Sequence, residues 1–367
     1  MANEDKATRF QRLRRRATVA AVGSCGLVLG LAWMAGPPGW ASVSASAGSL
    51  AQLGSLTVGA LGLLLLCAVA TFPATFFRDA VLTRRYGLLR ERPLAWIVDW
   101  SRHAGVNVVA GTVAVAACAV LRWLMEDAWW AIGGMAVAAA PFAAGRLLRV
   151  ESRGTPLARE ALCERLTRLL GKAGFPGLGL FQVHVGERTR VASAAIVNAG
   201  RARYVAISDT LLADHTDEEV EVVVAHELAH VAHHDVVIAQ AALAVHVAAS
   251  LLGAEVAVRW AGPIHGVMAA ARLPLALLTT GALFLLLRPL SLALSRLQER
   301  RADRYALTLT GNGPALTSVL RRLAANNLVE PAPSGLTVWW FHSHPAAAER
   351  MSGCGPVDST DGGGAAR

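Results

Sequence analysis

Charged residues are scarce in this chain, and its cysteines follow none of the spacings that metal or disulfide frameworks use. Only 17% of the 367 residues are Asp, Glu, Lys or Arg, whereas a soluble domain usually contains about a quarter. The five cysteines include no C-x-x-C pair, which argues against a disulfide framework and a cysteine zinc site. The net charge of +9 comes from arginines that cluster beside apolar runs. This clustering favours membrane anchoring and predicts no nucleic-acid partner.

Hydrophobic residues make up 54% of the chain and gather in runs long enough to cross a lipid bilayer. Six runs are expected to span, namely residues 17–36, 50–77, 104–121, 128–148, 236–258 and 267–290. The first run follows a basic segment, as the core of a secretory signal peptide also does. The length of this first run and the further apolar runs that follow it favour a membrane anchor instead.

The placement of Lys and Arg predicts the orientation, because short cytoplasmic loops are enriched in both. Basic residues crowd the first 16 residues and the loop 78–103, so both are expected in the cytoplasm, with the protein in the cell membrane. The predicted order is a basic cytoplasmic arm at 1–16, a membrane domain with about four helices at 17–148, a cytoplasmic part at 149–235, two further membrane helices at 236–290, a second cytoplasmic part at 291–351 and a disordered Gly-rich tail at 352–367.

The pentapeptide H-E-L-A-H at residues 226–230 is the most informative motif. On a helix, residues four apart share one face, so His226 and His230 can bind the same metal ion. Glu227 lies beside the first histidine, where it can accept a proton from a water that the metal holds. Zinc peptidases use this arrangement. The ordinary alternative is a surface helix that carries two histidines by chance.

The residues around the motif predict a small mixed domain. Residues 156–173 have the apolar spacing of an amphipathic helix. Three segments have the character of short strands, at 180–186, 191–197 and 203–208. The sequence T-D-E-E at 216–219 fits the capping box that starts a helix. The motif that follows is therefore expected on a helix, as its chemistry requires.

Catalytic zinc needs a third protein ligand and leaves its fourth position to water. The nearby candidates are His233, His234 and Asp235, and a more distant one is Glu299, in a segment with helical spacing. Asp303, one turn after Glu299, can accept a hydrogen bond from a ligating imidazole and orient it. Taken alone, however, the Glu299 segment is explained better as a charged helix face in solvent.

Several motifs taken together resemble the type I CAAX prenyl protease family and its bacterial relatives, the HtpX-like membrane proteases. They are H-E-L-A-H, then S-R-L-Q-E-R-R-A-D at 295–303, then F-H-S-H-P-A-A-A-E-R-M at 341–351. The resemblance implies a zinc metalloendopeptidase with one Zn²⁺ per chain, held by His226, His230 and Glu299.

The same resemblance implies roles for further residues. Glu227 is the expected catalytic base, and Asp303 is expected to support a ligating imidazole. His344 and Arg350, in the last motif, are expected to bind substrate or to stabilise the oxyanion that forms during peptide hydrolysis. A donor to such an oxyanion often contributes a few kcal/mol to catalysis.

One departure from the family pattern concerns the edge strand that is expected to bind the peptide backbone of the substrate. The family usually has Asn-Ala there, followed by Tyr or Phe, whereas this chain has Ser193, Ala194 and Ala195. Main-chain pairing with a peptide survives this change, but a contact from the Asn side chain does not. The change therefore bears on substrate preference and leaves the zinc chemistry as expected.

The combined expectation is a predominantly α fold, a multi-pass membrane helical bundle with a gluzincin-type catalytic domain that carries a small β-sheet. The predicted activity is cleavage of peptide bonds in membrane-associated or misfolded proteins or peptides, at the lipid bilayer. The alternative is a non-catalytic zinc-binding membrane scaffold or sensor, and Glu227 argues against it because a structural site needs no base. A transporter is disfavoured because few charges lie within the spans and no internal repeat is evident.

Overall fold

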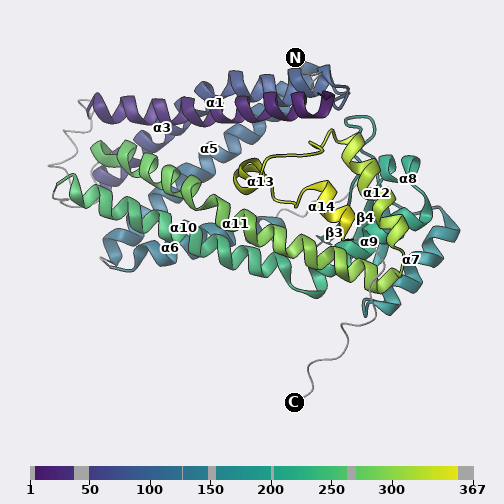
Figure 1. The fold of residues 1–367 in the computed structure, drawn as a ribbon. Coiled ribbons are helices and arrows are strands. Elements are labelled where there is room, and N and C mark those ends of the chain that lie inside the picture. Colours follow the sequence, from purple (N-terminus) through teal and green to yellow (C-terminus); the bar gives the residue numbers. More distant parts are fainter. Residues whose placement is uncertain are drawn as a thin grey trace. The chain divides into compact units, whose positions relative to one another are not determined.

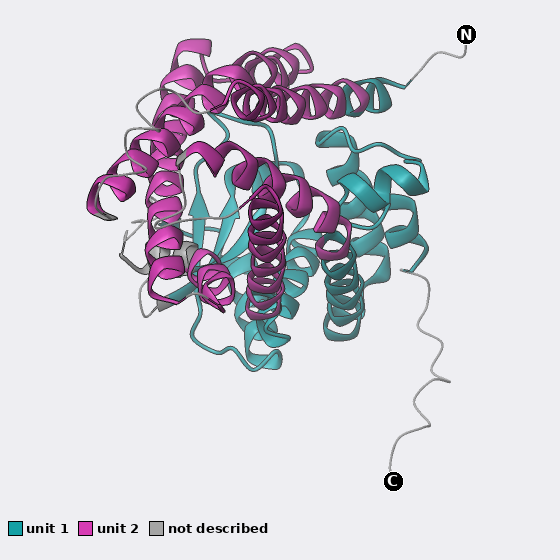
Figure 2. Ribbon diagram, turned by 90° about the vertical axis from the view of Figure 1, so that its left-hand side faces the viewer, with its two compact units in different colours: residues 1–11, 149–236, 292–367 teal, residues 12–148, 237–291 magenta. Residues whose placement is uncertain are grey.

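The structure, a computed structural model, describes residues 5–36, 49–125, 127–147, 154–199, 202–262 and 270–353. These residues form helices and one small sheet (Figure 1). The chain divides into two compact units (Figure 2), of which unit 1 comprises residues 1–11, 149–236 and 292–367 and unit 2 comprises residues 12–148 and 237–291. Each unit is therefore built from segments that lie far apart in the sequence.

Long apolar helices make up unit 2. Its elements are most of α1 (Lys6–Met34), α3 (Ser49–Phe76), the π-helix η2 (Phe77–Leu82), α4 (Thr83–Arg85), α5 (Pro93–Leu124), α6 (Trp129–Leu147), α10 (Asp235–Trp260), the 3-10 helix η3 (Ala270–Arg272) and the first half of α11 (Leu273–Thr310). Five helical stretches in the described part of the chain are long and apolar enough to cross a membrane: α1, α3 continued through α4, α5, α10 and α11. A helix satisfies its own backbone hydrogen bonds, which lipid cannot do. The chain is a multi-pass membrane protein.

Five of the six predicted spans fall largely within these helices, which are longer than the apolar runs. The arm predicted at 1–16 is helical from Lys6 onward and continuous with the first span. The fourth predicted span, 128–148, coincides with α6, but the apolar run with described side chains there is only Trp129–Ala139, so this span stays a prediction. From residue 354 onward, the predicted tail lies outside the described residues.

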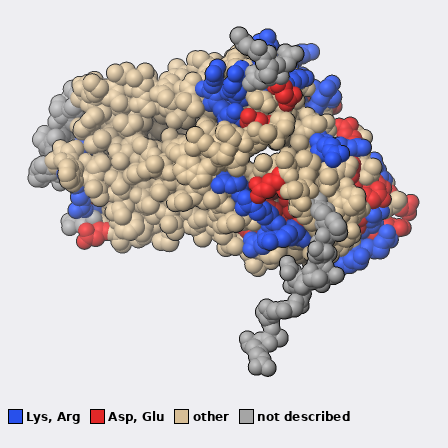
Figure 3. All heavy atoms as spheres, viewed as in Figure 1, with Lys and Arg blue, Asp and Glu red and all other residues tan. Residues whose placement is uncertain are grey.

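A small apolar cluster and one ionic group help to hold the helices of unit 2 together. A cluster on α3, α5 and α11 consists of Leu56, Ala60, Ala119 and Leu273. Glu255 on α10 is buried and accepts hydrogen bonds from Arg122 Nε at 2.9 Å and Arg259 Nε at 2.6 Å. The outward surface is apolar instead, and Figure 3 shows a long stretch over these helices that is nearly free of charged side chains. Such a surface suits contact with lipid.

Unit 1 contains a four-stranded sheet in the order β1-β2-β4-β3. The strands are β1 (Gly154–Pro156), β2 (Gly179–Val183), β3 (Ala194–Ala199) and β4 (Ala202–Ser208). β2 and β4 are parallel, whereas β1 and β3 run antiparallel to their neighbours, with Ala194 of β3 opposite Ile207 of β4. The three predicted strands are confirmed within a few residues. β1 was not predicted, since three residues are too few for a periodic pattern.

The helices of unit 1 share one apolar core with the sheet. They are α7 (Glu160–Lys172), α8 (Asp209–Asp214), α9 (Asp217–Ala232), the second half of α11, α12 (Gly313–Asn326), α13 (Gly335–Phe341) and α14 (Ala347–Ser352). Leu162 and Leu166 of α7 lie in this core with Val224 and Leu228 of α9, so the predicted amphipathic helix is confirmed. Burying each such side chain contributes about 1.5–3 kcal/mol. This packing fixes the orientation of α9, which carries H-E-L-A-H.

The two ends of α9 are set by local interactions. At the start, Thr216 Oγ1 accepts a hydrogen bond from Glu219 N, and Glu219 Oε2 accepts one from Thr216 N at 3.0 Å, which confirms the predicted capping box. The helix ends at Ala232, and His234 adopts a left-handed backbone conformation with φ 55°. Because this bend interrupts the helix before α10 begins, Asp235 comes to lie beside His230.

Gly134 is predicted to be essential for the close packing of α6 against α10. A Cβ atom added there would lie 2.7 Å from Ala248 Cβ and 2.8 Å from the Ala248 backbone nitrogen, so the helices would have to separate. Gly134→Ala should therefore destabilise the protein by about 1–3 kcal/mol, measured as a lower thermal unfolding temperature in micelles. The matched control is Gly62→Ala on α3, where no atom lies within 4 Å. Equal stability of the two variants would contradict the packing.

Candidate metal centre

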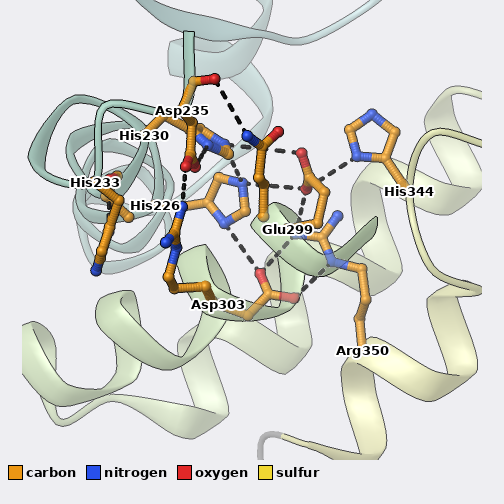
Figure 4. A network of polar contacts seen from close by, with 11 residues as sticks. His226, His230, His233, Asp235, Glu299, Asp303, His344 and Arg350 are labelled. Atoms are coloured by element: carbon orange, nitrogen blue, oxygen red, sulfur yellow. Dashed lines mark hydrogen bonds and ion pairs between the residues drawn. The ribbon is translucent and has the colours of Figure 1, made fainter. Parts of the chain in front are cut away.

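His226, His230 and Glu299 place three possible ligand atoms within 4.8 Å of one another (Figure 4). The two histidines come from α9, and their Nε2 atoms are 3.3 Å apart. Glu299 comes from α11, with its Oε2 3.3 Å from His226 Nε2 and its Oε1 3.8 Å from His230 Nε2. The helical spacing of four residues explains the shared face of the histidines. Only the fold explains the approach of Glu299.

The donor set fits a divalent cation. Glu299 Oε2 is buried and, within the described part of the chain, meets no donor with hydrogen-bond geometry. A buried polar atom left in this way is unfavourable, and a cation at the centre of the group would compensate it. Two imidazole nitrogens with one carboxylate oxygen are ligands that zinc commonly takes, with a fourth position left for water.

Each imidazole is held by its own carboxylate. His226 Nδ1 lies 3.0 Å from Asp303 Oδ1, and His230 Nδ1 lies 2.8 Å from Asp235 Oδ2. A carboxylate accepts a hydrogen bond, so each Nδ1 carries the proton and each Nε2 is left to bind a cation. The predicted contact of Asp303 with an imidazole is thus present in the structure. Asp235 was one of the sequence candidates for the third ligand. It contacts Nδ1 of His230 instead, whereas Glu299 lies near Nε2 of the same ring.

Each of these carboxylates is in turn paired with an arginine. Arg350 donates to both oxygens of Asp303, from Nε at 2.8 Å and from Nη2 at 2.7 Å. Arg301 pairs with Asp235 through Nη2. The two arginines hold their carboxylates ionised and oriented, so the site contains two His–Asp–Arg chains side by side. Sequence reasoning did not predict the contacts of Asp235 and Arg301, although an Asp soon after H-E-L-A-H was a signal.

The electrostatics of the site favour positive charge. Burial by itself lowers the pKa of His226, but its hydrogen bond with Asp303 and the nearby carboxylate of Glu299 outweigh burial and raise the pKa to about 9. A proton and a metal cation therefore compete for the same nitrogen. Burial also raises the pKa of Glu227, against the opposing effect of the neighbouring histidines. A carboxyl with a raised pKa is suited to accept and return a proton.

The other two histidines that were candidates for the third metal ligand are not part of the metal group. His233 Nδ1 lies 2.8 Å from the Ala229 carbonyl oxygen, and its ring packs against Tyr305. Figure 4 shows His233 directed away from Glu299. His234 occupies the left-handed position that ends α9. Among the described residues, neither histidine belongs to the three-residue metal-ligand group.

His344 and Arg350 reach Glu299 from the C-terminal segment. His344 Nδ1 lies 2.9 Å from Glu299 Oε2, and Arg350 Nη2 lies 3.7 Å from the same atom. The segment is tied to α11 by Arg296, whose Nη1 donates to the carbonyl oxygens of Val338 and His342 at 3.2 and 2.9 Å. The side chain of His344 is 61% exposed, whereas that of Arg350 is 15% exposed. His344 is thus the more accessible of the two.

Ser193, Ala194 and Ala195, the residues expected to bind substrate, lie at and just before the start of β3. Ser193 N donates to Ser208 Oγ at 3.0 Å, and Ser193 O accepts from Ser208 N. Of the strands in the described residues, β3 pairs only with β4, so its other edge is open. An open edge offers backbone groups to an extended peptide.

Comparison with known proteins gives a family and a fold. Residues 156–354 match the model for peptidase family M48. A stretch of 206 residues is 29% identical to the uncharacterized metalloprotease YhfN of Bacillus subtilis and covers 53% of this chain and 48% of that protein. A protease HtpX homolog of Ralstonia pickettii is 29% identical over 191 residues, which are 50% of this chain and 60% of that protein. The match thus spans about half the length of these curated relatives.

The fold is also similar to that in the crystal structure of S. mikatae Ste24p. The TM-score is 0.69 at 19% sequence identity, and the alignment covers 88% of this chain and 79% of the other. At this identity the comparison concerns the arrangement of the backbone.

Asp235→Asn is predicted to weaken metal binding by about 10- to 100-fold, because the amide no longer holds His230 as an ionised carboxylate does. The measurement is a competition titration with a chelator on purified protein in micelles, and it needs no substrate. Asp303→Asn should weaken binding similarly through His226. The control is Glu349→Gln, which changes a half-exposed carboxylate paired with Arg300. An unchanged affinity for Asp235→Asn would show that the contact does not support the metal.

Proposed function

Because the chain belongs to peptidase family M48, we propose that it is an integral-membrane metalloendopeptidase that uses one zinc ion to hydrolyse peptide bonds. The observation that carries this proposal is the position of Glu227 on α9, next to the group formed by His226, His230 and Glu299. A structural metal site needs no partly buried carboxyl with a raised pKa beside its ligands. A non-catalytic scaffold or sensor would not need this carboxyl either.

Zinc is the metal that this set of ligands favours. Two imidazoles and one carboxylate leave a coordination position open, as catalytic zinc sites do. The same set also occurs with iron in oxygenases, but the base beside the ligands and the family membership favour hydrolysis. A bound zinc ion supplies Lewis acidity, which makes water more acidic and a peptide carbonyl more electrophilic.

Three side chains have separate proposed roles in hydrolysis. The carboxylate of Glu227 accepts a proton from the attacking water and later donates it to the leaving amine. His344, the accessible donor beside Glu299, stabilises the negative charge that develops on the carbonyl oxygen. Arg350 donates to Asp303 from Nε and Nη2, so its main role is to hold the carboxylate that supports His226. Contact with the substrate is its secondary role.

The substrate is proposed to lie extended along the open edge of β3. Backbone groups near Ser193, Ala194 and Ala195 would pair with it, and the contacts of β3 with α9 bring this edge to the helix that carries Glu227. Main-chain pairing selects an extended conformation more than a sequence. Membrane-associated or misfolded proteins and peptides, which expose extended segments, are therefore the proposed substrates.

The proposed location is the cell membrane, with the metal group and the N-terminus on the cytoplasmic side. Arginines crowd the N-terminal arm and the region where the second candidate span ends and the third begins, where Arg84, Arg85 and Arg92 are exposed. Short basic segments of this kind are retained in the cytoplasm. The charge pattern thus supports this orientation.

Replacing the proposed base separates catalysis from metal binding. Glu227→Gln should keep one zinc ion per chain, measured by elemental analysis, while cleavage of an unfolded protein such as casein falls by about 100- to 10,000-fold. The control is Glu218→Gln on the same helix, where a partly exposed carboxylate pairs with Arg165. Cleavage at the original rate by Glu227→Gln would refute the mechanism. Zinc binding by the unaltered protein without any cleavage would favour the scaffold.

His344→Ala is predicted to lower kcat by about 100- to 1,000-fold with little change in KM, because an oxyanion donor acts mainly in the transition state. Zinc content should be unchanged, since His344 is outside the group of three ligand atoms. His184→Ala, which removes another largely exposed histidine of unit 1, is the control. A rise in KM with normal kcat would instead assign His344 to substrate binding.

A further inference from the structure

A cavity of about 300 Å³ lies between α3 and α5, and it is separate from the metal centre. Its polar lining comes from Thr71, Trp100, His103 and Asn107, and its apolar lining includes Leu64 and Val108. All of these residues belong to unit 2, and α3 and α5 pack against each other along their length. The cavity is therefore formed within one compact unit, by two candidate membrane spans.

The cavity opens on a surface suited to lipid. Next to its lining, Leu65 on α3 is 54% exposed, and Val106 and Val109 on α5 are 68% and 59% exposed. On helices that cross a membrane, exposed side chains of this kind contact acyl chains. A molecule in the cavity would therefore enter from the bilayer.

Two polar side chains on this surface have unused hydrogen-bonding groups. The side chain of Asn107 makes no hydrogen bond to any described residue and is exposed. His103 Nδ1 lies 2.7 Å from the Asp99 carbonyl oxygen, so Nδ1 carries the proton and Nε2 is left as an acceptor. Unpaired polar groups are costly in hydrocarbon, and polar residues inside a span commonly mark a binding site.

The lining changes from polar to apolar along the cavity. Trp100 lies at one end, as expected near the membrane surface. Arg102, outside the lining, is exposed and pairs with Asp99. Asn107 follows His103 by four residues, or about 6 Å along the helix. Leu64 lies at the opposite end, where a Cβ atom on Gly111 of α5 would approach its Cδ1 to 3.0 Å. This change from polar to apolar side chains along the cavity matches the headgroup, ester and acyl regions of a phospholipid.

We propose that the cavity binds a glycerophospholipid. Its ester carbonyls accept hydrogen bonds from the Asn107 amide, a headgroup hydroxyl or ammonium donates to His103 Nε2, and the first part of an acyl chain contacts Leu64 and Val108. The proposal does not depend on the proposed peptidase activity.

The test uses the full chain in nanodiscs of phosphatidylcholine and phosphatidylglycerol that contain a small fraction of photoreactive phosphatidylglycerol. After illumination, mass spectrometry maps the labelled peptides. Labelling is expected to concentrate on residues 64–71 and 100–108, above the level on the other spans. Uniform labelling of all lipid-facing helices would overturn the proposal.

Two kinds of variant probe the same cavity in different ways. Asn107→Leu combined with His103→Leu removes the polar contacts, and Ala68→Phe fills the space, because Ala68 also lines the cavity. Each should reduce labelling at these positions at least fivefold. The control is Ser101→Leu, an exposed position on α5 outside the lining, which should leave labelling unchanged. Unchanged labelling in both cavity variants, with normal thermal unfolding, would refute the site.

A competition experiment distinguishes lipid from a protein ligand. Added unlabelled phosphatidylglycerol should reduce labelling of the two segments in proportion to its concentration, and an apolar helical peptide of about 20 residues should not. Displacement by the peptide and not by the lipid would assign the cavity to a partner helix and overturn the proposal.

Discussion

The approach of Glu299 to His226 and His230 is the constraint on which the site depends. The histidines are adjacent because one helix carries them, but the carboxylate comes from a helix that begins as a membrane span and continues without a break to Thr310. Three donors can share one cation only if α9 and α11 keep their relative position to within a fraction of an ångström. The shared apolar core of unit 1 and the two His–Asp–Arg chains both help to fix the distance between Glu299 and the two histidines.

Successive turns of α11 hold the different parts of the site together. Arg296 binds carbonyl oxygens of the segment that leads to His344, Glu299 faces the histidines, and Asp303 contacts both His226 and Arg350. Because these residues are spaced three and four apart, they lie on one face of the helix. A single helix therefore orders the proposed ligands, their supporting carboxylate and the proposed oxyanion donor, so a bend in α11 would disturb all of them at once.

The two units follow opposite rules of burial. In unit 1, apolar side chains fill the interior and charges lie outside or in paired networks. In unit 2, many large apolar side chains face outward, and the interior combines a few apolar side chains with the ionic group around Glu255. The second arrangement is the stable one in lipid, because lipid offers no hydrogen-bond partners to polar groups. The exposed Asn107 departs from that rule, and for this reason it draws attention to the cavity between α3 and α5.

Features that depend on residues close together in the chain could be predicted from the sequence alone. The capping box at Thr216, the amphipathic α7 and the helix under H-E-L-A-H were all predictable, because each depends on residues a few positions apart. Contacts between side chains that are far apart in the sequence depend on the tertiary structure. Glu299 was selected from the sequence only through a family resemblance, since its own segment reads as a solvated helix face. The partnership of Asp235 with His230 required the bend at His234, a backbone reversal that no periodic pattern reveals.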